Sequence, residues 1–280
     1  MGHPDPQQVA AQVAQALAED VGTGDLTAAL VPADGVAHAR VISRQSAVLC
    51  GRAWFDEVFR QVDAAVELTW ACEEGALLRD GTEVVRMHGP ARSLLTAERC
   101  ALNFLQTLSG TATRAAQYVH AVTGTGVRIL DTRKTVPGLR MAQKYAVTCG
   151  GASNHRIGLY DAILIKENHI AAAGSVSAAL RAAQQVADDA GGVEIEIEVE
   201  NLEQLNDALS GGAKRVLLDN FSNELLVQAV DLNAGRARLE ASGGVSLESI
   251  RAIAETGVDD ISVGDITKDL RAVDFSMRFL

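Results

Sequence analysis

The feature that most constrains this chain is a series of short apolar runs after Gly126, each of which ends at a polar residue or a glycine. Such runs, separated by longer stretches with helical spacing, indicate repeated βα units. The six runs are VRIL before Asp131, AILI before Lys166, VEIEIEV at 193–199, RVLLD ending at Asp219, ARLEA before Ser242 and DISV before Gly264. The helical stretches lie near 138–149, 173–190, 202–211, 222–233 and 246–256. The pattern predicts a parallel sheet with right-handed crossovers, which we expect to close into a barrel with fewer than eight strands.

The first part of the chain follows a different pattern. Apolar and polar residues alternate in VAHARVIS (36–43), VELTWAC (66–72) and EVVRMHG (83–89), as is typical of half-buried antiparallel strands. The segments 7–18 and 52–62 have helical spacing. A third helical stretch runs from Ser93 to about Val122, and Ser109-Gly110 is expected to kink or divide it. We therefore predict a small α+β domain before the parallel sheet.

Composition and charge exclude several classes of protein. The chain has 280 residues, 48% of them hydrophobic, and a formal net charge of −11, which argues against nucleic acid or an anionic membrane as its main partner. Its cysteines form no CxxC pair, and their spacing fits neither a zinc site nor a disulfide framework. The N-terminus does not resemble a signal peptide, and no apolar run approaches the roughly 20 residues of a membrane span. We expect a cytoplasmic protein with reduced thiols.

Polar side chains gather where the predicted parallel strands end, which is where α/β barrels place their reactive groups. These ends carry DTRKT at 131–135, KENH at 166–169, Glu198, DN at 219–220, SGG at 242–244 and GD at 264–265, and the loop before the second predicted strand carries HR at 155–156. Residues 131–169 hold six basic and three acidic side chains in a chain that is acidic overall. This segregation suggests a polyanionic substrate, with carboxylates placed for a metal ion or sugar hydroxyls. Ordinary surface ion pairs are the alternative for any single residue.

Glycines after the last two predicted strands suggest a phosphate site. Ser242-Gly243-Gly244 follows an apolar strand and is expected to open a helix at about Ser246, whose N–H groups would face an anion. Gly264 ends the next strand. A tight turn alone would also explain the two glycines. The sequence has no GxGxxG after a strand, no GxxxxGK[ST], no HExxH and no GxSxG. His155 and His169 lie beside basic residues and make a poor metal site.

Eight segments now carry a family resemblance. They are EDVGTGDLT (19–27), AERCALNFLQTLSG (97–110), LDTRKTVPGLR (130–140), KYAVTCGGASNHRIGLYDAILIKENHI (144–170), IEIEVENLEQL (195–205), LLDNF (217–221), EASGG (240–244) and SVGDIT (262–267). In this order they resemble the quinolinate phosphoribosyltransferases over nearly the whole chain. The DTRKT, NHR and KENH stretches together are highly specific.

The resemblance implies a fold, an assembly and a reaction. The fold is α/β, with an N-terminal open sandwich over 1–112 and a barrel over 113–267, and the tail at about 268–280 is expected to pack on the N-terminal domain. The assembly is a homodimer in which one subunit's N-terminal domain covers the other's barrel mouth, with higher assembly left open. The implied reaction transfers phosphoribosyl from phosphoribosyl pyrophosphate to quinolinate with decarboxylation. Its products are nicotinate mononucleotide, pyrophosphate and CO₂, as required for NAD biosynthesis.

The resemblance also implies a role for each site residue. The residues expected around the two quinolinate carboxylates are Thr132, Arg133, His155 and Arg156, with Arg99 from the partner subunit. The catalytic set is expected to be Lys134, Lys166, Glu198 and Asp219. Within that set, the two lysines would face substrate anions, while Glu198 and Asp219 would meet the ribose hydroxyls and Mg²⁺, directly or through the substrate. The residues expected around the 5′-phosphate are Ser242, Gly243 and Gly264.

The chemistry of these residue types agrees with that reaction. The planar fork of arginine suits carboxylates, and carboxylates near the ribose stabilise the positive charge that develops on its reacting carbon. Two alternatives stay open at this point. One is a paralogous phosphoribosyltransferase for another aromatic acid, and the other is a non-catalytic phosphate-binding barrel.

Overall fold

The computed structural model describes residues 4–280 and contains two compact units. The first unit comprises the described part of residues 1–116 together with 135–151 and 269–280. The second comprises 117–134 and 152–268. Each unit contains more than one segment of the chain, so single boundaries such as those predicted at 112 and 267 cannot be compared with them directly and stay predictions. Within residues 4–280, no helix is both long and apolar enough to cross a membrane.

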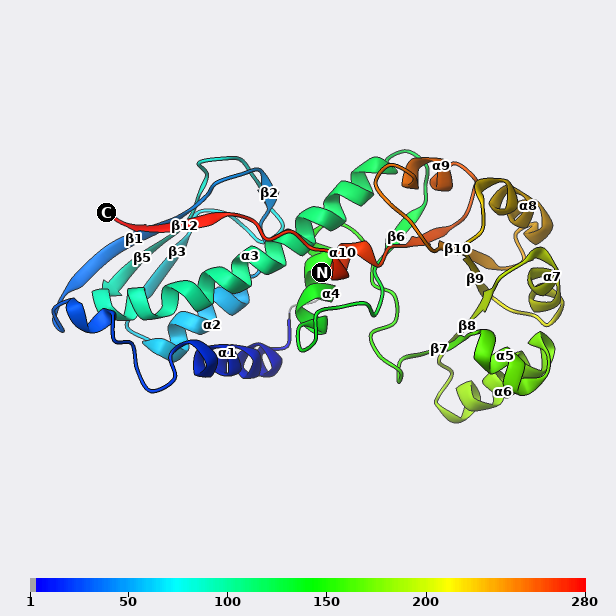
Figure 1. The fold of residues 1–280 in the computed structure, drawn as a ribbon, viewed down its shortest axis with the longest axis horizontal. Helices are drawn as coiled ribbons and strands as arrows, with labels where there is room; N and C mark the ends of the chain where they lie inside the picture. Colours follow the sequence, from blue (N-terminus) through cyan, green and yellow to red (C-terminus); the bar gives the residue numbers. More distant parts are fainter. Residues whose placement is uncertain (1–3) are drawn as a thin grey trace. The chain divides into compact units, whose positions relative to one another are not determined.

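The first unit is built on a four-stranded antiparallel sheet in the order β12-β1-β5-β3. Its strands are β1 (Val36–Ser43), β3 (Glu67–Trp70), β5 (Glu83–Pro90) and β12 (Phe275–Phe279). The strand β2 (Ala47–Val48) pairs separately with β4 (Leu77–Leu78). Its helices are α1 (Pro6–Asp20), α2 (Arg52–Val62), most of α3 (Ala91–Ala121) and α4 (Arg140–Cys149), with a 3₁₀ turn at Ala28–Leu30. Strand β12 belongs to the C-terminal tail and pairs with β1 along its outer edge (Figure 1).

One hydrophobic core holds this unit together. Helix α2 buries Trp54, Phe55, Val58 and Phe59, which recur at helical spacing and therefore share one face. Alternate residues of β1 and β5 are buried in the same cluster. Each fully buried large apolar side chain contributes about 1.5–3 kcal/mol, so this cluster is the main source of stability in the unit.

Helix α3 is continuous from Ala91 to Ala121, so the predicted division at Ser109-Gly110 is wrong (Figure 1). Ser109 is fully buried, and its hydroxyl both accepts a hydrogen bond from Cys50 N (2.9 Å) and donates to Cys50 O (3.1 Å). A serine interrupts a helix when it bonds competing backbone groups nearby. Here the hydroxyl is occupied by a distant segment instead, and the helix continues.

The second unit is a six-stranded parallel sheet in the order β6-β11-β10-β9-β8-β7. The strands are β6 (Arg128–Leu130), β7 (Ala162–Ile165), β8 (Glu194–Val199), β9 (Arg215–Asp219), β10 (Arg238–Ser242) and β11 (Asp260–Ser262). Each predicted apolar run forms one strand, which confirms the predicted parallel α/β architecture with fewer than eight strands. At the seam between β6 and β7, Leu130 forms a single parallel bridge with Ser153.

Helices cover the outside of this sheet (Figure 1). They are α5 (Glu167–Ala173), α6 (Val176–Asp189), α7 (Leu202–Ser210), α8 (Asn223–Asn233) and α9 (Ile250–Ala254), while the short α10 (Asp265–Lys268) follows β11. Helix α9 begins at Ile250, so the helix predicted to open at about Ser246 is wrong in its start. Ser246 and Ser249 exchange side-chain and backbone hydrogen bonds, which hold this stretch as a turn.

Candidate active site

A cavity of about 570 Å³ lies at the carboxyl ends of the parallel strands. Its lining includes ten of the twelve site residues predicted from the sequence: Thr132, Arg133, Lys134, His155, Arg156, Lys166, Glu198, Asp219, Ser242 and Gly243. Parallel strands bring their carboxyl ends to one edge of the sheet, which explains how segments far apart in the chain meet here.

Two arginines form the cationic wall of the cavity. The Nε atom of Arg133 is buried and has no hydrogen-bond partner among the described residues. Burial and the nearby charge of Arg133 lower the pKa of Arg156, whose Nη1 donates a long hydrogen bond to Ala162 O (3.4 Å). Two like charges in a partly buried wall repel each other, so an anion placed between them would be stabilised.

The acidic wall is formed by the ends of β8 and β9. Glu198 is half-buried and accepts from Lys166 Nζ at 2.5 Å. The Oδ2 atom of Asp219 accepts from Asn220 Nδ2 at 2.8 Å. Along β8 the three glutamates differ in burial: Glu194 is exposed, Glu196 is buried and Glu198 lies at the cavity end.

The glycine turns lie beside the same cavity. Gly243 has φ = +100°, and a Cβ atom there would lie 2.1 Å from Asn220 Oδ1, so only glycine fits. Gly264 is not among the cavity-lining residues, but a Cβ atom there would lie 3.1 Å from Lys134 Cδ and 3.6 Å from Thr132 Oγ1. The segment that follows β10, where the sequence suggested a phosphate site, is therefore a turn, because α9 begins six residues after Gly244.

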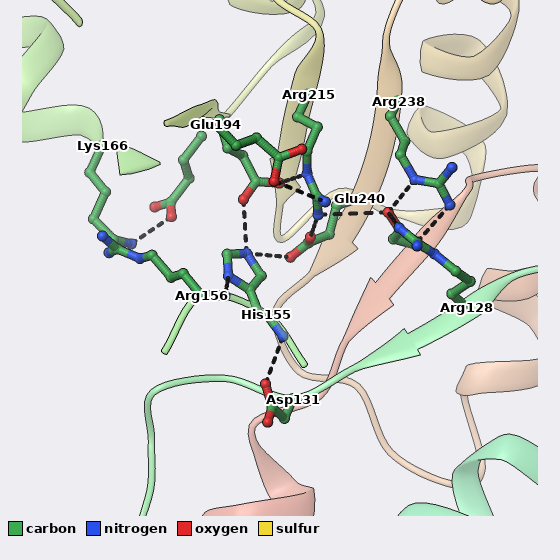
Figure 2. A network of polar contacts seen from close by, with 12 residues as sticks. Arg128, Asp131, His155, Arg156, Lys166, Glu194, Arg215, Arg238 and Glu240 are labelled. Atoms are coloured by element: carbon green, nitrogen blue, oxygen red, sulfur yellow. Dashed lines mark hydrogen bonds and ion pairs between the residues drawn. The ribbon is translucent and has the colours of Figure 1, made fainter. Parts of the chain in front are cut away.

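His155 is held by buried carboxylates (Figure 2). Its Nε2 lies 2.8 Å from Glu196 and 3.5 Å from Glu240. The backbone N–H of Arg156 donates to Nδ1 (2.7 Å), and the backbone N–H of His155 donates to Asp131 (2.8 Å). The imidazole with its proton on Nε2 satisfies both ring contacts, so Nε2 donates to Glu196. Both ring nitrogens are thus engaged within the protein.

An ion-pair network extends from Glu240 through the sheet (Figure 2). Arg215 donates to Glu240 (2.7 Å) and to Glu196 (3.3 Å), and its Nη2 lies 3.6 Å from Asp260. Asp260 is fully buried and accepts from the side chains of Arg128 and Arg238. Buried charges are tolerated when they are paired in this way.

This environment shifts the pKa values of the two central glutamates apart. Burial and the charge of Glu196 raise the pKa of Glu240 to about 7. Burial also opposes ionisation of Glu196, but the hydrogen bond from His155 and the charges of His155 and Arg215 outweigh it, so its pKa is lowered. Burial disfavours protonation of His155, yet Glu196 and Glu240 outweigh it and raise its pKa. Glu196 is therefore the ionised member of the carboxyl pair near neutral pH, and Glu240 is the one closer to protonation.

The acidic wall fits a hard divalent cation. Glu198 and Asp219 line the same cavity and offer carboxylate oxygens, the ligands that Mg²⁺ prefers. Glu198 is already paired with Lys166. Two carboxylates leave most of an octahedral shell to substrate oxygens and water, which is the usual arrangement for Mg²⁺ with phosphorylated substrates.

Arg99 is the predicted site residue that the structure places elsewhere. It is exposed on α3 in the first unit, whereas every residue that lines the cavity belongs to the second. Within residues 4–280 it makes no hydrogen bond or ion pair. Its charge acts to lower the pKa of Glu98, although burial raises that pKa overall.

Known proteins match both parts of the chain. A sequence model described as "Quinolinate phosphoribosyl transferase, C-terminal domain" matches residues 111–278, and one for the N-terminal domain of the same enzymes matches residues 25–109. The chain belongs to the quinolinate phosphoribosyl transferase family. The resemblance inferred from the sequence is thereby confirmed.

Individual members of the quinolinate phosphoribosyl transferase family are similar over almost their full length. A Mycobacterium leprae protein named nicotinate-nucleotide pyrophosphorylase [carboxylating] is 43% identical, and the match covers 95% of each chain. A Bacillus subtilis protein, named as a probable enzyme of the same kind, is 41% identical over 92% of this chain and 89% of its own. The solved structure of the nicotinate-nucleotide pyrophosphorylase from Francisella tularensis has a TM-score of 0.96 and 44% identity, and covers 99% of this chain and 98% of that one.

The network beneath the cavity was not predicted from the sequence. Its members outside the predicted site include Arg128, Glu196, Arg215, Arg238, Glu240 and Asp260. The alternation of glutamates in VEIEIEV is the sequence feature that could have indicated this network. A strand buried in a parallel sheet reads as a nearly continuous apolar run, so regularly placed carboxylates require buried cationic partners.

Proposed function

We propose that this chain transfers the phosphoribosyl group of phosphoribosyl pyrophosphate to quinolinate and releases pyrophosphate and CO₂, leaving nicotinate mononucleotide. The relatives' names describe the same interconversion from the product side. The observation that carries the proposal is the two-sided cavity, in which Arg133 after β6 and Arg156 in the loop before β7 face carboxylates from the β8 and β9 ends.

Quinolinate would be bound on the cationic wall. Arg133 offers a buried Nε without a partner in residues 4–280, and the pKa of Arg156 is lowered by burial and by Arg133. A dianion placed between them would give Arg133 Nε an acceptor and would stabilise the charge of Arg156. Arginine forks bind carboxylates with two parallel hydrogen bonds. Thr132 lies beside this wall. His155, whose ring nitrogens are engaged, would position Arg156 through the backbone contact and complete the wall with its ring edge.

Transfer would take place against the acidic wall. The lone pair of the quinolinate nitrogen forms the bond to the ribose carbon as the bond from that carbon to the pyrophosphate oxygen breaks. Glu198 and Asp219 would stabilise the positive charge on the sugar, and Lys134 and Lys166 would face the departing anion. A bound Mg²⁺ would supply further charge neutralisation for the pyrophosphate.

Decarboxylation follows from the charge on the new ring nitrogen. When the bond between the ring and the adjacent carboxylate breaks, its electron pair is accepted by the pyridinium, CO₂ leaves, and a proton from solvent replaces it. No side chain has to act as a nucleophile. Ser242, Gly243 and Gly264 would hold the 5′-phosphate throughout.

We further propose that the enzyme works as a homodimer in the cytoplasm and that Arg99 contributes to the partner's carboxylate wall. The exposed, unpaired state of Arg99 within residues 4–280 supports this role. Higher assembly built from such dimers is compatible with it.

Substrate choice tests the proposed function. Nicotinate lacks one of the two carboxylates, and a cation left unpaired in a partly buried wall costs several kcal/mol. We expect kcat/KM for nicotinate to be lower than for quinolinate by at least about a hundredfold. Comparable values would contradict the assignment. A clear preference for another aromatic acid, with orotate as the comparison, would indicate the paralogous enzyme, and no turnover with any acid would indicate a binding barrel.

A further inference from the structure

Two cysteines and a glutamate come together in the first unit, whereas the residues that line the catalytic cavity belong to the second. One ligand atom from each of Cys50, Glu74 and Cys149 lies within 4.8 Å of the other two. Cys50 follows β2, Glu74 lies in the loop after β3, and Cys149 ends α4. Cys50 is fully buried and Cys149 is 6% exposed. The expectation that these cysteines form no site rested on sequence spacing, which does not detect residues brought together by folding.

The backbone around this cluster is fixed. Cys50 is held to α3 by its two hydrogen bonds with Ser109. The Glu74 carboxylate accepts from Gly51 N (2.8 Å) and Arg52 N (3.2 Å) at the start of α2. Gly150, next to Cys149, packs so closely on α3 that a Cβ atom there would lie 2.3 Å from Ala112 O. The three ligand atoms are therefore held near one another before anything binds.

The groups of the cluster also contact one another. Burial and a hydrogen bond with Cys149 raise the pKa of Cys50. The same hydrogen bond lowers the pKa of Cys149 against the opposing effects of burial and Glu74. Tyr145, one turn earlier on α4, also donates to Cys149, and burial raises its pKa, so it remains a donor. Two thiols thus lie against a carboxylate, with Cys50 and Cys149 both buried.

The ligand set selects the metal. Two thiolates and one carboxylate suit a borderline-soft ion such as Zn²⁺ and not Mg²⁺ or Ca²⁺, which bind oxygen alone. Zinc bonds of about 2.3 Å to sulfur and about 2.1 Å to oxygen place tetrahedral ligands roughly 3.5–4 Å apart, so only small side-chain rotations would close the site. The positive end of α2 would compensate the excess negative charge of such a complex.

We propose that Cys50, Glu74 and Cys149 form a Zn²⁺ site in the N-terminal unit. Binding forms two Zn–S bonds and one Zn–O bond and releases the two thiol protons to solvent. Water or the Tyr145 hydroxyl completes the tetrahedron. The ion stabilises the unit by joining the end of α4 to the segments on either side of α2.

Metal titration of the full chain tests the proposal. The purified protein is stripped with a chelator and titrated with Zn²⁺, and separately with Co²⁺, whose thiolate charge-transfer absorption reports sulfur ligation. We expect one tightly bound ion per chain, the Co²⁺ absorption, and a higher melting temperature with Zn²⁺. Cys149→Ser should weaken binding by at least about a hundredfold, because the loss of even an outer partner of a metal site costs 10–100-fold.

The matched control is Cys72→Ser, because Cys72 lies outside the cluster, packs against the same core and donates a hydrogen bond from Sγ to Glu83 O (3.6 Å). Equal loss of Zn²⁺ in this variant, or equal affinity in wild type and Cys149→Ser, would overturn the proposal. If Cys149→Ser does not fold, Glu74→Gln replaces it, with reduced affinity expected. Absence of the Co²⁺ absorption in the wild type overturns the proposal on its own. None of these measurements depends on phosphoribosyl transfer.

Discussion

Glu240 occupies a buried position beneath the cavity, between His155, Glu196 and Arg215. Its pKa is raised from 4.5 to about 7, so the folded chain holds a proton there that the unfolded chain has already lost above pH 4.5. A raised carboxyl pKa makes folding less favourable as pH rises through this window. Stability attributable to this group should therefore fall between about pH 5 and pH 8.

The variant Glu240→Gln removes that titration and keeps the shape of the side chain. Between pH 5 and pH 8, the wild type should lose more unfolding free energy than the variant, by roughly 2 to 3 kcal/mol. Urea unfolding at the two pH values measures the difference. The control is Glu194→Gln, on the same β8–β10 side of the network but largely exposed, which should keep the wild-type slope. Parallel pH profiles of wild type and Glu240→Gln would contradict this account of Glu240.

Among single residues, those that line the cavity were easier to predict from the sequence than those of the buried ion-pair network beneath it. Asp131, Lys166 and Asp219 are recognisable because they are polar residues at the ends of apolar runs. Glu240 and Asp260 are not, because each has the position of a strand residue and its partners lie on other strands. Which carboxylate is paired with which arginine depends on lateral strand order, and a local pattern does not contain that information.

The turns after β9 and β10 support each other. Asn220 N donates to Ser242 O (2.9 Å), and the Asn220 side chain lies where a side chain at Gly243 would be and holds Asp219 Oδ2. A methyl group at Gly243 would therefore displace Asn220 and, through it, the Asp219 carboxylate.

Gly243→Ala is expected to lower kcat/KM for phosphoribosyl pyrophosphate by more than about tenfold, since a misplaced electrostatic group costs at least that much. The matched control is Gly212→Ala, which shares the left-handed backbone (φ = +83°) but meets no atom within 4 Å. Both variants should lose about 1–2 kcal/mol of stability from backbone strain. Steady-state kinetics and thermal unfolding separate the loss of activity from the loss of stability. Equal activity in the two variants would show that displacing Asn220 does not affect catalysis.

At the scale of elements, periodicity found the regular segments and missed the irregular ones. The run RAWFDEVFRQV and α2 coincide, as do VAHARVIS and β1. The helix α5 was not predicted, because it is only seven residues long and begins within the polar KENH stretch. In the structure Lys166 caps this helix, and its backbone N–H donates to His169 Nδ1 (2.9 Å). Strand β12 consists of five residues that become a strand only by pairing with β1, and local sequence does not encode that pairing.

At the scale of the whole molecule, the proposed dimer makes a prediction about complementation. If Arg99 serves the partner's cavity and Arg133 its own, Arg99→Ala and Arg133→Ala homodimers should each be nearly inactive. Co-refolding equal amounts should restore roughly a quarter of wild-type activity, because half the dimers are mixed and each has one intact site. Each variant refolded alone is the control. If mixed dimers form and no activity returns, Arg99 acts within its own subunit.

The division of the chain is where sequence was least informative. Periodicity separates an antiparallel part from a parallel part, but the compact units interleave: residues 135–151, with α4, belong with the N-terminal segment although they lie between β6 and β7. The buried face of α4 determines the unit to which this segment belongs. Ala142, Ala146 and Cys149 join the core of the first unit, and which core a helix joins is a tertiary property.

We expect phosphoribosyl transfer and decarboxylation of quinolinate to occur together in the cavity formed by the β6–β11 ends. The most direct measurement counts CO₂ released from quinolinate labelled in its 2-carboxylate against pyrophosphate formed from phosphoribosyl pyrophosphate with Mg²⁺. We expect equal amounts, no CO₂ without phosphoribosyl pyrophosphate, and a parallel fall of both by about a hundredfold in Asp219→Asn. Pyrophosphate formed without CO₂, or CO₂ released without phosphoribosyl pyrophosphate, would contradict this expectation.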